Sequence, residues 1–147
     1  MIRRLEPNIT YTFLEIAWSG RRKRFCIKVK PNTTEARQFV DLCTGQRGSS
    51  FFNTRLTRVW NNCLIGGNYD YGVNRMMLPD ISYEGRVMFR SHTDSSGEFI
   101  INTEGIIPKF GVDIGHVIKG LKVLQEVVQL CDTTQVTVVD CGVVVDF

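Results

Sequence analysis

Apolar and polar side chains alternate along two neighbouring segments near the start of the chain. Residues 9–18 are rich in β-branched and aromatic types, and residues 25–30 alternate apolar with polar side chains. This pattern is typical of strands that bury one face. Ser19 and Gly20 separate the two segments, so we predict a strand, a turn and a second strand, with residues 21–24 in the turn.

A helical pattern follows at residues 31–45. Its apolar residues recur at spacings of three and four and share one face: Ala36, Phe39, Val40 and Cys43. Thr33 or Thr34 can cap the first turn, and Gly45 can end the helix in a left-handed conformation. The same spacing predicts a second helix from about Lys119 to Cys131. Both helices are expected to cover a β structure.

Most of the remaining chain has a β pattern. Short strand-like segments, separated by Gly, Asn, Asp and Ser, lie near 55–60, 63–66, 86–90, 98–103, 112–117 and 134–146. Many short strands with only two helices predict a mainly β barrel, in which closure removes exposed sheet edges. Residues 68–85 show the least periodicity and are predicted to form a long surface loop.

The composition fits one compact domain over residues 1–147, either as a whole protein or as a part of a longer one. Of the 147 residues, 43% are hydrophobic and 22% are charged, which suffices for a buried core. No apolar run reaches the roughly 20 residues of a membrane-spanning helix, and the first residues lack the apolar core of a signal peptide. We therefore expect a cytoplasmic or nuclear protein with no membrane partner.

The cysteines and histidines give no sign of a metal or cofactor site. Five cysteines occur, none in a C-x-x-C motif: Cys26, Cys43, Cys63, Cys131 and Cys141. An odd number without that spacing favours buried thiols over a disulfide framework or a zinc site. His116 has no ligating neighbour at metal spacing, and His92 lies in a loop-forming stretch. We predict no metal ion and no cofactor.

Four consecutive cations form the densest charge cluster of the chain: Arg21, Arg22, Lys23 and Arg24. Neighbouring like charges repel each other, so these side chains need either solvent or an anionic partner. The net charge of +3 is too small to indicate nucleic-acid binding by itself. A solvated end of the hairpin and a site for nucleic acid or an anionic surface both remain open.

Five segments, in the same order, match the motifs of one known protein family and together cover most of the chain. The turn at 66–69 is similar to a Gly-Gly-Asp-Phe motif, and the segment at 97–103 is similar to Ser-Gln-Phe-Phe-Ile-x-Thr. The other three similar segments lie at 31–45, 112–121 and 136–142. Through these five segments the chain resembles the cyclophilin family of prolyl isomerases. The resemblance implies a closed eight-stranded antiparallel barrel capped by two helices.

The same resemblance implies that the isomerase site has been replaced. In similar cyclophilins an arginine and a glutamine stabilise the twisted prolyl amide, and a ring pocket holds the proline. An ungapped count from the Gly-Gly pair places Thr57 at the arginine, Asn62 at a pocket phenylalanine and Ile65 at the glutamine. Glu98 replaces a second glutamine, and Ile100 replaces the phenylalanine of the pocket floor.

Three further positions of the implied site also differ. Gly111 stands at the histidine, Ile106 lies near the tryptophan, and Arg90-Ser91 replaces an Ala-Asn segment that pairs with substrate backbone. Arg55 lies two residues before Thr57, hence on the same face of a strand, and is the only substitute for the lost arginine.

We therefore predict a catalytically inactive cyclophilin-like domain, not an enzyme, that binds a protein partner and has no small-molecule substrate. The altered pocket supplies the predicted partner-binding residues, which are Asn62, Ile65, Glu98, Ile100 and Gly111. Two alternatives remain open. One is nucleic-acid or anionic-surface binding through the four cations, and the other is weak prolyl isomerisation that depends on Arg55.

Overall fold

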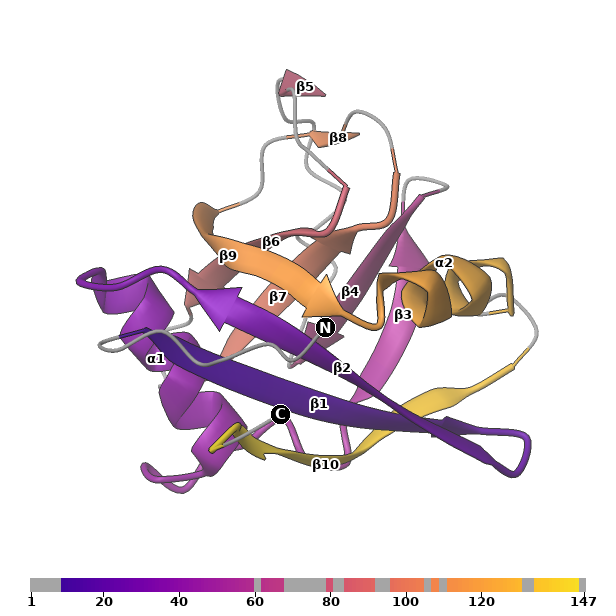
Figure 1. Ribbon diagram of the computed structural model, residues 1–147, viewed down its shortest axis with the longest axis horizontal. Coiled ribbons are helices and arrows are strands. Elements are labelled where there is room, and N and C mark those ends of the chain that lie inside the picture. The colour runs from indigo at the N-terminus through magenta and orange to yellow at the C-terminus, as the bar shows by residue number, and fades with distance from the viewer. Residues whose placement is uncertain are drawn as a thin grey trace.

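The computed structural model shows a closed β-barrel with one helix at each end (Figure 1). The structure describes residues 9–59, 62–67, 79–80, 84–91, 96–104, 107–108, 111–130 and 134–145. Its helices are α1 (Thr34–Thr44) and α2 (Leu121–Leu130). Its strands are β1 (Thr10–Trp18), β2 (Arg21–Val29), β3 (Arg55–Val59), β4 (Cys63–Gly67), β5 (Pro79–Asp80), β6 (Arg86–Ser91), β7 (Gly97–Asn102), β8 (Ile107–Pro108), β9 (Val112–Lys119) and β10 (Val136–Val143).

Eight of these strands close the barrel in the order β1-β10-β3-β4-β7-β6-β9-β2, and neighbouring strands are antiparallel. This confirms the predicted mainly β, closed eight-stranded barrel with two helices. β5 and β8 pair separately, outside the barrel (Figure 1). β5 lies within the predicted loop at 68–85, most of which falls outside the described residues. Cys131, His92 and Ile106 also lie outside them.

The β1–β2 hairpin corrects one prediction. Its turn consists of Ser19 and Gly20 alone, with φ angles of 45° and 78°, and Trp18 pairs directly with Arg21. Two residues with positive φ make the tight turn that matches the twist of antiparallel strands. The four cations from Arg21 to Arg24 therefore begin strand β2 and do not form the turn, although all four are exposed.

Helix α1 begins and ends where the sequence predicts. The Thr33 hydroxyl accepts a hydrogen bond from the Ala36 amide at 3.1 Å, which caps the first turn. Gly45 has a φ of 73°, and its amide donates to the Asp41 carbonyl at 2.8 Å. The second helix, α2, starts at Leu121, two residues later than predicted, because Lys119 still belongs to strand β9. Neither described helix is long and apolar enough to cross a membrane.

The interior of the barrel holds a cluster of four phenylalanines. Phe39, from α1, lies 5.3 to 5.9 Å from the ring centroids of Phe51, Phe89 and Phe99. All four side chains are buried, and edge-to-face contacts at such distances are favourable. The cluster therefore ties the apolar face of α1 to strands β6 and β7, whose opposite face carries the positions of the implied isomerase site.

Candidate functional site

Three of the predicted site positions lie in one row across the barrel wall. Thr57 of β3 pairs with Ile65 of β4, Ile65 pairs with Ile100 of β7, and Ile100 pairs with Met88 of β6. Directly paired residues on neighbouring strands have their side chains on the same face. The adjacent residues Leu64, Val87 and Ile101 belong to the core cluster. The side chains of the paired residues therefore face away from the barrel interior. We call these four residues the outer row: Thr57, Ile65, Ile100 and Met88.

The outer row is buried and apolar. Ile65 and Ile100 are 0% exposed, Met88 is 7% exposed, and Thr57 is half-buried. Only the Thr57 hydroxyl can donate a hydrogen bond, because isoleucine and methionine side chains carry no polar hydrogen. The row therefore supplies no charged group, acid, base or strong nucleophile to a bound peptide.

A charged pair lies beside the outer row. Arg90 of β6 pairs in register with Glu98 of β7, and its Nε donates to the Glu98 Oε1 at 2.7 Å. The Nη2 atom of Arg90 contacts the same oxygen. Glu98 is fully buried, whereas 26% of the Arg90 side chain is exposed. The guanidinium thus compensates a carboxylate that water does not reach.

Sequence reasoning identified both members of this pair but did not join them. Arg90 and Glu98 are eight residues apart on neighbouring antiparallel strands, and each stands where the resemblance implies a neutral residue. Two opposite charges at positions that a hairpin brings together were the available signal. The pairing shows that the two changes form a single structural feature.

Asn62 serves as a structural link at the start of β4. The side-chain Nδ2 of Asn62 donates a hydrogen bond to the backbone carbonyl of Glu104. The backbone carbonyl of Asn62 accepts hydrogen bonds from the Thr103 amide at 3.0 Å and from the Thr103 hydroxyl at 2.6 Å. These contacts hold the entry to β4 against the residues that follow β7. One of the five predicted partner-binding residues is therefore a side chain that already makes a hydrogen bond within the fold.

Gly111 cannot carry a side chain in this backbone conformation. It has a φ of 62°, and an added Cβ atom would lie 2.1 Å from the Phe89 carbonyl oxygen. Such a distance is a steric clash. A histidine at this position, as the resemblance implies for active members, would require the backbone to move.

Arg55, the remaining candidate for the missing arginine, lies at one side of the outer row. It pairs with Thr137 of β10 and is two residues along β3 from Thr57, which pairs with Ile65. Two residues of a strand span about 7 Å. The exposed side chain of Arg55 therefore leaves the backbone about 7 Å along β3 from Thr57, the nearest residue of the outer row on that strand.

As for partner contact, Ile65, Glu98 and Ile100 are all 0% exposed. A partner reaches these side chains only if what covers them moves. Asn62 and Gly111 keep part of their surface exposed. Binding at this set of residues stays a prediction, and the accessible part of the region is its edge.

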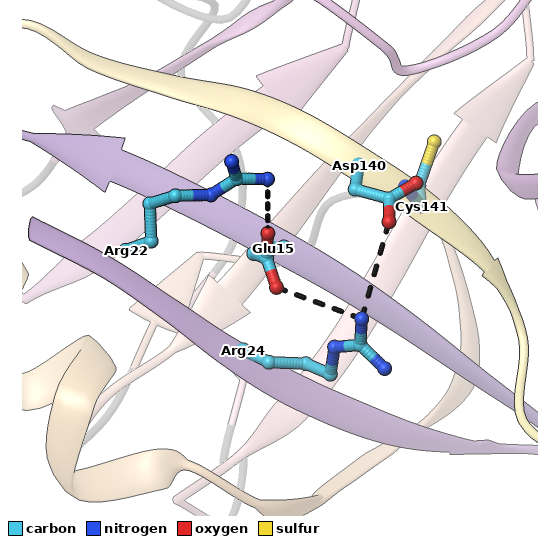
Figure 2. A network of polar contacts seen from close by, with 5 residues as sticks. All are labelled: Glu15, Arg22, Arg24, Asp140 and Cys141. Atoms are coloured by element: carbon cyan, nitrogen blue, oxygen red, sulfur yellow. Dashed lines mark hydrogen bonds and ion pairs between the residues drawn. The ribbon is translucent and has the colours of Figure 1, made fainter.

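Three of the four cations of the hairpin have carboxylates close by. Arg22 contacts Glu15, and Arg24 lies 3.5 Å from Glu15 and 3.9 Å from Asp140 (Figure 2). The Arg24 guanidinium also lies 3.9 Å from the centre of the Phe13 ring. On the far side of the hairpin, Arg21 lies 3.4 Å from Glu126 of α2.

These carboxylates come from β1, β10 and α2, and they offset most of the positive charge that the sequence shows at residues 21–24. A nucleic acid needs a concentrated positive surface to release counterions. Anion binding by the four cations stays a prediction. The positive charge that they could offer to an anion is smaller than the sequence alone indicates, because nearby carboxylates offset part of it. The four cations are Arg21, Arg22, Lys23 and Arg24.

The described cysteines are free thiols. Cys26, Cys43 and Cys63 are buried, as predicted, and Cys141 is half-buried. Burial raises the pKa of Cys63 to about 12 and raises the pKa of Cys43 well above its ordinary value. A thiol with a raised pKa holds little thiolate at neutral pH and is a poor nucleophile. Within the described ranges, no three His, Cys, Asp or Glu residues group as metal ligands.

The chain is similar in structure to the mimivirus cyclophilin, whose crystal structure it matches with a TM-score of 0.70 and 18% sequence identity. The match covers 99% of this chain and 97% of that chain. No protein-family model matches the sequence, and no curated protein matches it. The structural match shows a cyclophilin-like fold, which confirms the fold that the sequence resemblance implied.

Proposed function

We propose, from the premise of a cyclophilin-like barrel, that this protein is a catalytically inactive cyclophilin-like domain that binds a protein partner. The observation that carries the proposal is the outer row, in which Thr57 and Ile65 occupy the positions where the resemblance implies an arginine and a glutamine as hydrogen-bond donors. A fold by itself does not specify an activity, so whether the barrel catalyses isomerisation has to be inferred from the side chains of this row.

Prolyl isomerisation needs a donor that favours the twisted amide. The barrier to rotation is about 18 to 20 kcal/mol because the double-bond character of the amide is lost midway. A charge-assisted hydrogen bond contributes roughly 1.5 to 3 kcal/mol, so losing the arginine alone lowers the rate about 10 to 100-fold. Thr57 offers a neutral hydroxyl on a short side chain, and Ile65 offers no donor.

The Arg90–Glu98 pair supports the same proposal. By the resemblance, Arg90 stands where similar cyclophilins have a small alanine beside the substrate backbone. The Arg90 side chain is long and is held by Glu98 through two nitrogen atoms. A peptide entering along this edge would have to displace a paired guanidinium, which disfavours the substrate orientation of an active member.

A protein partner would contact the edge of the row, where Thr57, Asn62 and Arg90 keep exposed surface. A rigid barrel wall offers such a surface at a low entropic cost, because its backbone is already ordered. The edge differs from that of an active cyclophilin in shape and in charge, so it would select a different sequence.

The isomerase assay tests inactivity directly. We expect a proline-containing peptide to isomerise at its uncatalysed rate in the presence of this protein, and we expect no binding of cyclosporin, the ligand of similar cyclophilins. The Thr57→Ala variant should give the same result as the unchanged chain. Catalysis near the rate of an active cyclophilin would refute the proposal. Weak catalysis that disappears in Arg55→Ala would assign it to Arg55.

Partner binding is tested by affinity purification from the source cell with three baits: the unchanged domain, Thr57→Lys and Thr44→Lys. Thr44 is exposed at the end of α1 and serves as the matched control. We expect a protein that binds the unchanged domain and Thr44→Lys but is lost with Thr57→Lys, while thermal unfolding shows all three baits folded. Equal capture by all three baits, or no specific capture, argues against a partner site at the row.

A further inference from the structure

A cavity of about 410 Å³ lies between strand β2 and helix α1, at a different place from the outer row. The chain enters α1 here, at the left of Figure 1. Four apolar residues line it, Val29, Pro31, Ala36 and Val40, of which Val29 and Ala36 are almost fully buried and Pro31 is exposed. Three cations, Lys30, Arg37 and Arg47, line it as well. A volume of this size is within the range of small-molecule sites.

Two of the three cations already have carboxylate partners. The Lys30 Nζ lies 3.0 Å from the Asp113 Oδ2, and the Arg47 Nε lies 3.1 Å from the Asp41 Oδ2. Among the residues that the structure describes, Arg37 forms no ion pair, and its side chain is exposed. Asp41 is the one carboxylate of the described lining, so the cavity wall keeps a positive excess.

Neutral polar groups complete the cavity wall. Thr10 contributes a hydroxyl and Asn32 an amide, and both belong to the lining. Asn32 has a φ of 63°, in the left-handed region, where the chain turns from β2 toward α1. Hydroxyl and amide groups donate hydrogen bonds to anionic oxygens, while the accessible side chains of Pro31 and Val40 offer contact only to an apolar group.

We propose that this cavity binds a small organic phosphate, with its apolar part against Val40 and Pro31 and its phosphate near Arg37 and Lys30. A phosphate monoester carries more negative charge than a carboxylate, and guanidinium groups bind its oxygens through paired hydrogen bonds. The site is independent of the outer row, so it can be occupied whether or not the row binds a protein.

Titration calorimetry and amide NMR with phenyl phosphate test the proposal, with inorganic phosphate and benzoate as comparison probes. Phenyl phosphate should bind saturably and more tightly than either comparison probe. It should shift the amide signals of Asn32, Ala36 and Arg37. Affinity should fall at least about tenfold in Arg37→Gln, because one charge-assisted hydrogen bond is lost.

The control is Lys122→Gln, an exposed cation of α2 that does not line the cavity. It should leave the affinity unchanged. The proposal is overturned if phenyl phosphate does not bind saturably or if Arg37→Gln binds as well as Lys122→Gln. Equal binding of phenyl phosphate and inorganic phosphate also overturns it, because the apolar wall would then contribute nothing. The NMR shifts of the unchanged protein decide the location without any variant.

Discussion

Replacing Arg90 with alanine is expected to lower the free energy of unfolding by about 2 to 4 kcal/mol, because it leaves the Glu98 carboxylate buried without its guanidinium. Glu98 is 0% exposed and Arg90 supplies two nitrogen atoms to one of its oxygens. The loss is smaller than for a fully buried pair, because water reaches 26% of the Arg90 side chain. Urea unfolding measures the change.

The matched control for this variant is Arg21→Ala, which removes a solvent-exposed ion pair. Arg21 and Glu126 are 61% and 57% exposed, so the change should stay within about 0.5 kcal/mol. Adding Glu98→Gln to Arg90→Ala should restore part of the lost stability, because a neutral amide is easier to bury than a carboxylate. Equal losses for Arg90→Ala and Arg21→Ala would contradict the structural role of the pair.

Phe39→Ala is expected to destabilise the protein by about 3 to 5 kcal/mol, since it removes a fully buried ring and leaves a cavity. The ring contacts three other phenylalanines at centroid distances of 5.3 to 5.9 Å, and these neighbours lie on separate segments of the chain. They cannot all close the space at once, so the cost should lie in the upper half of that range. Denaturant unfolding followed by circular dichroism measures it.

Phe52→Ala is the control for the same chemical change at the surface. Phe52 follows Phe51 directly, yet its side chain is 59% exposed. Its truncation should change the free energy of unfolding by less than about 1 kcal/mol. If both variants lose the same stability, Phe39 does not hold α1 in the barrel as the ring contacts indicate.

The two variants separate the scaffold from the candidate site. Phe39 acts on the inner face of β6 and β7, whereas Arg90 and Glu98 lie on their outer face. A cyclophilin-like barrel can keep its interior while its outer face changes, because neighbouring residues of a strand point to opposite faces. The proposed loss of catalysis therefore needs no change in the packing that holds the fold.

Local residue choices predicted the fold well. Thr33 and Gly45 define the ends of α1 through their own backbone and side-chain chemistry, and Ser19-Gly20 defines a tight turn. The prediction failed where length mattered: residues 21–24 were assigned to that turn, but two residues complete it and the four cations continue as strand. The length of the turn depends on which residues of β1 and β2 pair with each other, and the sequence of a single segment does not reveal this pairing.

By itself, the sequence determined the barrel, its two helices and the identity of the residues at the positions where the resemblance implies isomerase chemistry. Only the tertiary structure decided which of them meet and which are accessible. Glu15 and Asp140 are 125 positions apart, yet both lie within 4 Å of Arg24. Ile65 and Ile100 are buried although they face away from the core. Local propensity acts over a few residues, whereas charge compensation, burial and cavities depend on segments that only folding brings together.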